Sequence, residues 1–299
     1  MAVNISNLGT ETRNKKTENI DLLSTREIIE IMNEEDLNVV SAIKEGLTQI
    51  EAVILECINT YKNGGRIIYI GAGTSGRLGL MDAVEVVPTY NSDRFVGLIA
   101  GGSGAFIKAV EGAEDSKELC VKDLKEINLS SNDMVIGIAA SGRTPYVIGG
   151  LDYAKEIGCI TGSVCCNLNT EISKHADFPI EVSAGPEVVT GSTRLKSGTC
   201  QKIILNMIST ATMIGVGKVY GNLMVDVKPT NEKLVERCRR IVMEATGCDH
   251  DLADKVLNET NNSCKLAIIM ILLNISLDEA KQRLDNAQGF IRDAIKNTY

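Results

Sequence analysis

The sequence predicts an α/β fold in which helices flank a parallel five-stranded sheet in three layers and a small helical subdomain follows. Short apolar runs alternate with segments of helical periodicity as far as Val182. The first run ends in a glycine-rich turn, and the pattern after Ala184 is helical throughout. Short apolar strands that alternate with helices are typical of parallel sheets with both faces covered.

The elements of the sheet follow one another in order. After a polar first segment, apolar residues recur at helical spacing from Thr25 to about Lys62. Helical patterns begin again at Arg77, at about Ala105 and at Pro145, each after an apolar run. Strands are expected at residues 66–70, 95–100, 134–140, 160–165 and 179–182.

The remainder of the chain is expected to be helical. Ser197–Val216 has the pattern of a long, mostly buried helix, and Asn231–Thr246 that of an amphipathic one. Three short helices are expected after Gly247, the last beginning with a capping box at Ser276–Glu279. We therefore predict an extended segment over residues 1–24, a main domain over 25–235 and a small helical, UBA-like subdomain over 236–299.

Composition excludes several classes of protein. The chain has 299 residues, is 44% hydrophobic and carries a formal charge of −8, which argues against a nucleic-acid partner. No uninterrupted apolar run reaches the ~20 residues of a membrane span, and the polar N-terminus lacks a signal-peptide pattern, so a cytoplasmic protein without membrane contact is expected. Nine cysteines, with no CxxC or HExxH pattern, predict reduced thiols and no metal site.

Two turns of similar chemistry follow the first and third strands. Gly71–Gly76 matches GxGxxG, but the second strand ends without the acid that a dinucleotide site requires. A P-loop is excluded because no Gly-Lys-Ser/Thr follows the glycines. The third strand ends in Ser141–Thr144, and the carboxyl ends of parallel strands meet at one edge. Together the turns suit a single phosphate monoester; the alternative, stronger for either turn alone, is an ordinary helix cap or tight turn.

The expected ligands of the phosphate are hydroxyl and backbone N–H donors, because neither turn contains a lysine. Either Arg77 or Arg143 would add positive charge. The donors expected are those of Thr74, Ser75, Gly76, Ser141 and Thr144.

The paired turns resemble the sugar isomerase (SIS) phosphosugar-binding family, which has a flavodoxin-like three-layer fold. Longer strings resemble, within it, the N-acetylmuramic acid 6-phosphate etherases, from about Thr10 to the C-terminal helices. One departure is Val87, where that family usually has a proline. The strings are Thr10–Asn14, Gly71–Gly79 with Asp82, Glu85 and Pro88, Ser141–Val147, Pro186–Val188, Thr190–Thr199, Gly217–Tyr220 and Asn222–Asp226.

The resemblance implies cleavage of a lactyl ether by elimination followed by water addition, in a homodimer, with no metal or cofactor. It assigns the proton donor to Glu85, whose pKa burial would raise, and the second catalytic acid to Glu114. Spacing alone does not choose between Glu114 and Glu111, which are three apart on one expected helix. Glu111 is therefore retained as a possible hydroxyl or base contact.

Two further segments enter through the same resemblance. Residues 190–199 precede a long helix, so Arg194 or Lys196 would meet the lactyl carboxylate at its N-terminus. The alternative is a capping segment with a solvated basic pair. Thr10–Asn14 would fold over a site, with a role that the residues themselves do not indicate.

The position of Glu85 raises a geometric difficulty. On a straight helix it lies eight residues beyond Arg77, roughly 12 Å along the axis, which exceeds the reach of a hexose phosphate. Either the helix breaks near Gly79, or Glu85 completes the site of a partner subunit.

Two other functions fit the same turns. One is a non-enzymatic sensor similar to the glucokinase regulatory protein, which is about twice as long. The other is an aldose–ketose phosphosugar isomerase, which leaves the strings at 190–199 and 222–226 unexplained.

Overall fold

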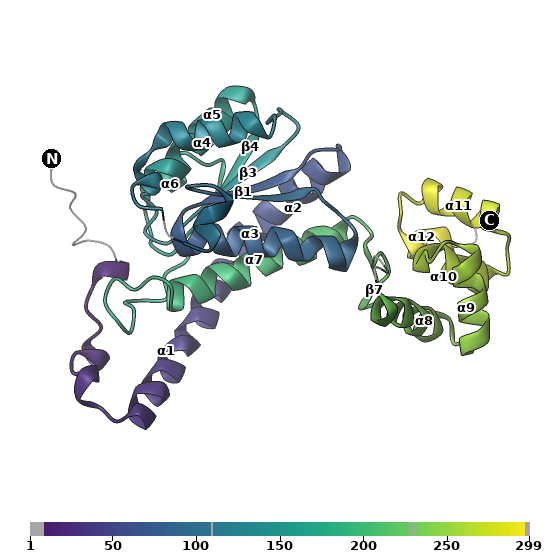
Figure 1. The fold of residues 1–299 in the computed structure, drawn as a ribbon, viewed down its shortest axis with the longest axis horizontal. Helices are drawn as coiled ribbons and strands as arrows, with labels where there is room; N and C mark the ends of the chain where they lie inside the picture. Colours follow the sequence, from purple (N-terminus) through teal and green to yellow (C-terminus); the bar gives the residue numbers. More distant parts are fainter. Residues whose placement is uncertain (1–8, 109, 228, 230, 297–299) are drawn as a thin grey trace. The chain divides into compact units, whose positions relative to one another are not determined.

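The structure is a computed structural model that describes residues 9–108, 110–227, 229 and 231–296 (Figure 1). The described chain divides into two compact units. The first contains residues 9–84 and Arg94–Ser209, and the second contains Glu85–Asp93 and the described residues from Thr210 onward. The boundaries predicted after residues 24 and 235 remain predictions.

The first unit is built on the parallel sheet that the sequence predicts. Its strands pair in the order β2-β1-β3-β4-β5, all of them parallel. Every strand lies within a residue or two of its expected position. The strands are β1 (Ile67–Gly71), β2 (Phe95–Ile99), β3 (Met134–Ala139), β4 (Ile160–Cys165) and β5 (Phe178–Glu181).

Helices cover both faces of the sheet, as Figure 1 shows. On one face, α4 (Lys117–Glu126) and α5 (Pro145–Ile157) bury a core that includes Ile68, Val135 and Leu151. The other face carries α2 (Leu47–Lys62), α3 (Gly73–Tyr90) and, beside α3, α7 (Lys196–Gly215). The short α6 (Glu171–Lys174) precedes β5.

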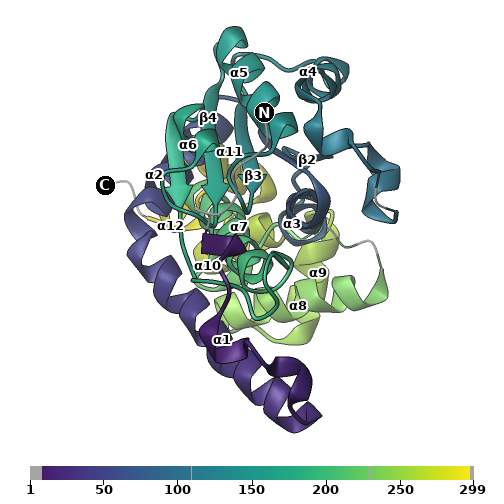
Figure 2. The ribbon, with the colours of Figure 1, turned by 90° about the vertical axis from the view of Figure 1, so that its left-hand side faces the viewer.

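The helical segment expected from Thr25 to Lys62 is two helices. A capping box at Ser24 begins α1 (Thr25–Glu45), and Gly46 separates it from α2. In Figure 2, α1 extends away from the sheet. Its outward side carries apolar residues, with Leu37 68% and Val40 65% exposed.

The helix expected to begin at about Ala105 does not form there, and this prediction was wrong. In its place the chain forms short turns at Ser103–Phe106 and Ala113–Asp115, and α4 begins only at Lys117. A positive φ at Gly112 interrupts the helical path. Glu111 and Glu114 therefore do not share a helix.

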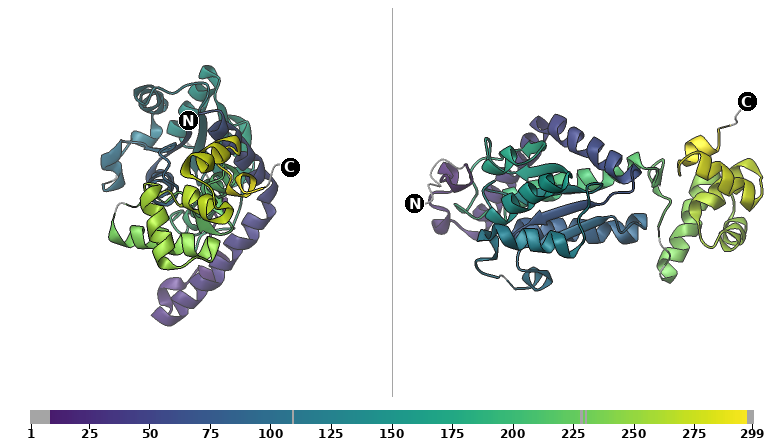
Figure 3. Two further views of the ribbon diagram at one scale, coloured as in Figure 1. Left: turned by 90° about the vertical axis from the view of Figure 1, so that its right-hand side faces the viewer. Right: turned by 90° about the horizontal axis from the view of Figure 1, so that it is seen from above.

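The second unit is mostly helical (Figure 3). Its core is α10 (Cys264–Leu273), packed by neighbouring helices, and the capping box expected at Ser276 is present. A fourth short helix after Gly247, α12 (Ile291–Ala294), was not expected. The other elements are the hairpin β6 (Val219–Tyr220) and β7 (Leu223–Met224), with α8 (Glu232–Thr246), α9 (His250–Glu259) and α11 (Leu277–Asn286). Within the described ranges, every helix is too short or too polar to cross a membrane.

The close packing of α3 on β2 leads to a test. A Cβ at Gly97 would lie 2.5 Å from Leu80 Cα, which is backbone that cannot move aside. Gly97→Ala should lower the free energy of unfolding by about 1–3 kcal/mol, measured by denaturant titration. The control is Gly104→Ala, where a Cβ meets nothing within 4 Å. Equal stability of the two variants would contradict the close packing.

Candidate active site

The first glycine-rich turn places the start of α3 directly against the end of β1. A Cβ at Gly76 would lie 2.6 Å from the carbonyl oxygen of Gly71, so only glycine permits this approach. Gly73 has a φ of +53°, and the helix closes when Gly76 N donates to Ala72 O at 3.1 Å. The N–H groups of Gly73, Thr74 and Ser75 precede that bond in the first turn. They form the positive end of the helix dipole.

The second turn follows the neighbouring strand. β1 and β3 pair in register, Gly71 opposite Ile138, so residues 141–144 and 72–76 leave the same edge of the sheet. Gly142 has a φ of +71° and packs where a Cβ would meet Thr170, and Thr144 is the N-cap of α5. In the order 2-1-3-4-5, β2 is added on one side of β1 and β3 on the other. Ligands bind in such sheets at this reversal of strand order, between β1 and β3.

A cavity of about 200 Å³ opens beside the first turn. It brings Arg77 together with Glu114, which lies in the 113–115 turn, and with Glu111, which lies just before that turn. The Arg77 guanidinium donates to Ala105 O at 2.8 Å and to Phe106 O at 2.9 Å, which holds the 103–106 turn against α3. The full lining is Ala72, Gly73, Arg77, Ala100, Ala105, Val110, Glu111, Gly112 and Glu114.

Glu85 lies outside that lining. α3 is continuous from Gly73 to Tyr90, so the break suggested near Gly79 is wrong, and Glu85 is about 12 Å along the axis from Arg77. The Glu85 side chain is exposed, contrary to the expected burial.

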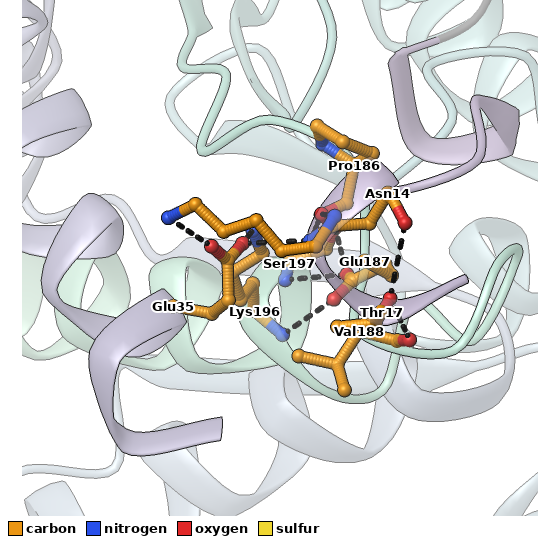
Figure 4. Close-up of polar contacts among 9 residues, drawn as sticks. Asn14, Thr17, Glu35, Pro186, Glu187, Val188, Lys196 and Ser197 are labelled. Atoms are coloured by element: carbon orange, nitrogen blue, oxygen red, sulfur yellow. Dashed lines mark hydrogen bonds and ion pairs between the residues drawn. The ribbon is translucent and has the colours of Figure 1, made fainter. Parts of the chain in front are cut away.

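Lys196 is also placed differently from expectation. It is only 1% exposed, and its ammonium forms a 2.7 Å ion pair with Glu35 of α1 (Figure 4). Burial opposes ionisation of Glu35, but hydrogen bonds from Lys196, Lys16 and Asn14 outweigh it and lower its pKa to about 2. The Lys196 ammonium thus joins α7 to α1 and is not exposed to solvent.

A second buried carboxylate occupies the N-terminus of α7. Glu187, which is fully buried, accepts from Lys196 N and Ser197 N at 2.9 Å each (Figure 4). It also accepts from Ser197 Oγ at 2.7 Å. These contacts satisfy two of the first N–H groups of α7 from within the chain. Arg194 is exposed in the preceding loop.

The N-terminal segment docks at the carboxyl edge of the sheet. Thr10 N donates to Asn167 Oδ1 at 3.3 Å, and Asn167 Nδ2 donates to Ala140 O, next to the second turn, at 3.1 Å. Further along, Thr17 Oγ1 donates to Val188 O at 2.8 Å. The segment therefore supports both the second turn and the loop before α7.

Ser75 points toward α7. Its side chain is buried, and Oγ donates to Gln201 Oε1 at 2.9 Å. Thr74 also faces α7, because a Cβ at Gly198 would lie 3.5 Å from Thr74 Cγ2. Of the expected phosphate ligands, Gly76 is buried, while Ser141 and Arg143 are half-buried.

Comparison with known proteins assigns the chain to a family. A protein from Lactiplantibacillus plantarum named N-acetylmuramic acid 6-phosphate etherase 2 is 57% identical over 295 residues, covering 98% of this chain and 100% of the relative. A protein of the same name from Enterococcus faecalis is 57% identical with the same coverage. The chain belongs to the N-acetylmuramic acid 6-phosphate etherase family.

Two further matches concern the fold that this etherase family shares. Residues 49–155 match the family model described as the glucokinase regulatory protein N-terminal SIS domain. A phosphoheptose isomerase from Francisella tularensis superposes with a TM-score of 0.51 at 13% identity, covering 64% of this chain and 100% of that one. The predicted SIS-type α/β fold is confirmed.

Three residues around this etherase-family site were missed by sequence reasoning: Glu35, Glu187 and Gln201. A signal existed for Glu35, since it falls on the apolar stripe of α1 between Met32 and Val39. A charge on a buried stripe requires a partner. Glu187 and Gln201 lie in a loop and on a helix with no local pattern that marks them.

The Glu35–Lys196 pair leads to a test. The folded pKa of Glu35, about 2, lies below its ordinary 4.5, so the pair stabilises the fold above about pH 4.5 and this is lost as pH falls toward 2. Lys196→Met should destabilise by about 2–4 kcal/mol at pH 7, and by clearly less at pH 3. Thermal unfolding measures both, with the exposed Lys202→Met as control. A pH-independent difference would contradict the assignment.

Proposed function

We propose that the chain cleaves the D-lactyl ether of N-acetylmuramic acid 6-phosphate to N-acetylglucosamine 6-phosphate and D-lactate. The observation that carries this is the cavity in which Arg77 and two carboxylates lie beside the N-terminus of α3. Full-length relatives at 57% identity that are named for this activity support it. The activity belongs to recycling of cell-wall amino sugars in the cytoplasm.

The phosphate is anchored first. The first-turn N–H groups of α3 and the helix dipole favour an anion, and Arg77 at the cavity adds a positive charge. Ser141 and Thr144 bring hydroxyl donors from the adjacent strand end. A doubly charged headgroup held this way fixes the sugar for the following steps.

The chemistry then requires a base and an acid. The proton on C2, beside the carbonyl of the ring-opened sugar, is weakly acidic, and Glu114 removes it. The C3–O bond then breaks and lactate leaves with a proton on its former ether oxygen, because an alkoxide is a poor leaving group. Water then adds to the resulting double bond: its oxygen bonds to C3 while one of its protons passes to the acid that protonated the lactate, and Glu114 returns its proton to C2. Glu111, on the same cavity, binds a sugar hydroxyl.

We propose that Glu85 is the acid, supplied by the second subunit of a homodimer. It is exposed in this chain, and its neighbours on α3 are exposed apolar residues, with Met81 40%, Val84 58% and Val87 39% accessible. A carboxyl near exposed apolar side chains becomes buried when another surface covers them, and burial in general favours the protonated form of a carboxyl. The exposed apolar side of α1 supports the same assembly.

A phosphosugar sensor is the second candidate, because residues 49–155 match the SIS domain of the glucokinase regulatory protein. Incubation with N-acetylmuramic acid 6-phosphate and assay of D-lactate separates the two. Release of lactate is expected. Tight binding of the sugar phosphate without lactate would favour the sensor.

The two acids at the cavity should differ in effect. Glu114→Gln should lower kcat by about 10²–10⁴-fold, because it removes the base, while Glu111→Gln should mainly raise KM. The control is Glu156→Gln, an exposed carboxylate on α5. Steady-state lactate release provides the measurement. A normal kcat in Glu114→Gln would show that another group is the base.

If each active site takes Glu85 from one subunit and Glu114 from the other, two inactive variants should restore activity when they are mixed. A mixture of Glu85→Gln and Glu114→Gln subunits forms mixed dimers in which one site has both native acids. After random reassociation, lactate release should recover to about a quarter of the wild-type rate. Neither variant alone, dissociated and reassociated in the same way, should recover. Failure of the mixture to recover would place Glu85 in the site of its own chain or outside catalysis.

A further inference from the structure

The contact between Ser75 and Gln201 leaves a buried hydrogen-bond donor of Gln201 without a partner among the described residues. Gln201 is completely buried on α7, and Ser75, in the first turn of α3, is 7% exposed. The Ser75 hydroxyl donates its only proton to Gln201 Oε1 at 2.9 Å. The Gln201 Nε2 group has no hydrogen-bond partner among the residues that the structure describes. A buried amide donor without a partner is costly and therefore rare.

In this arrangement Ser75 cannot donate to a phosphate. A hydroxyl carries one proton, and an anion accepts but does not donate. Turning the Gln201 carboxamide over exchanges Oε1 and Nε2. Nε2 then donates to Ser75 Oγ, and the Ser75 proton is free to point toward an anion at the start of α3.

We propose that Gln201 is a positioning residue that sets the direction of the Ser75 hydroxyl, and that phosphate binding is coupled to reversal of its carboxamide. The proposal rests on the proposed function, in that the phosphate binds at the first turn of α3. It extends that function because Gln201 acts through Ser75 and does not itself touch the ligand. The reversal gives the Nε2 group a partner in the bound state.

Contacts at the start of α7 hold Gln201 in a fixed position next to Ser75. α7 is anchored one turn earlier by Glu187, which caps its first N–H groups, and by the Glu35–Lys196 ion pair. Gly198 packs against Thr74, so the first turns of α7 and α3 are in contact. Reversal of one carboxamide requires no movement of either helix.

Two variants with side chains of similar shape test whether the Gln201 carboxamide directs the Ser75 hydroxyl. In Gln201→Glu the side chain only accepts, so Ser75 stays turned away and a negative charge lies near the phosphate. Binding of N-acetylglucosamine 6-phosphate, measured by calorimetry, should weaken by about 100-fold or more. Gln201→Met removes the carboxamide that orients the Ser75 hydroxyl but leaves that hydroxyl in place. It should weaken binding by about tenfold, and the loss should appear in KM and not in kcat.

Ser75→Ala supplies the control. If Gln201 acts through Ser75, Gln201→Met should add nothing to the loss caused by Ser75→Ala. N-acetylglucosamine without its phosphate should bind all variants equally. Equal effects of Gln201→Met with and without Ser75, or wild-type affinity in Gln201→Met, would overturn the proposal and reduce Gln201 to a packing residue.

A measurement on the wild-type protein remains decisive if a variant fails to fold. The side-chain NH₂ signals of Gln201, in protein labelled with ¹⁵N at glutamine, should shift on addition of N-acetylglucosamine 6-phosphate but not of N-acetylglucosamine. Unchanged signals at saturation would contradict the reversal. Lactate release by the same protein tests the proposed function separately. Release with unchanged Gln201 signals would overturn only this inference, and absence of phosphosugar binding would overturn both.

Discussion

The approach of α3 to the end of β1 is the constraint on which the site depends. With glycine at 71 and 76, the helix begins two residues after the strand, and a Cβ at Gly76 would fall 2.6 Å from a backbone oxygen. This directs the first-turn N–H groups of α3 to the carboxyl edge of the sheet. Arg77 follows at once and ties down the turn that carries the cavity wall. A looser connection would separate the anion-binding end of α3 from Glu114.

Buried charges organise the chain around that core. Glu35 and Glu187 draw the N-terminal segment, α1 and the loop before α7 into one network through Lys196. Such pairs stabilise little compared with an apolar core, but each charge left without its partner is costly, so they specify one arrangement. The result is that α7 presents Gln201 to Ser75 at a defined position. Segments that look like polar tails in the sequence are therefore part of the support of the site.

The sequence predicted the sheet closely because fully buried parallel strands leave an unmistakable apolar pattern, as Ile67–Gly71 and Met134–Ala139 do. It failed after Ala105, where Gly112 in a left-handed conformation overrides helical spacing. It also misplaced Lys196, because a buried ion pair with a residue 161 positions away has no local signature. Spacing predicted which strand ends meet. It could not predict which side chains at those ends face a cavity and which face a helix.

The central claim is that the phosphate binds at the first turn of α3, facing Glu114 across the cavity. A crystal structure of the protein with N-acetylglucosamine 6-phosphate tests this most directly. The account predicts phosphate oxygens within hydrogen-bond distance of the N–H groups of residues 73–75, with the Glu114 carboxylate beside C2 of the sugar. Phosphate bound in the loop around Arg194, with the sugar distant from Glu114, would contradict it.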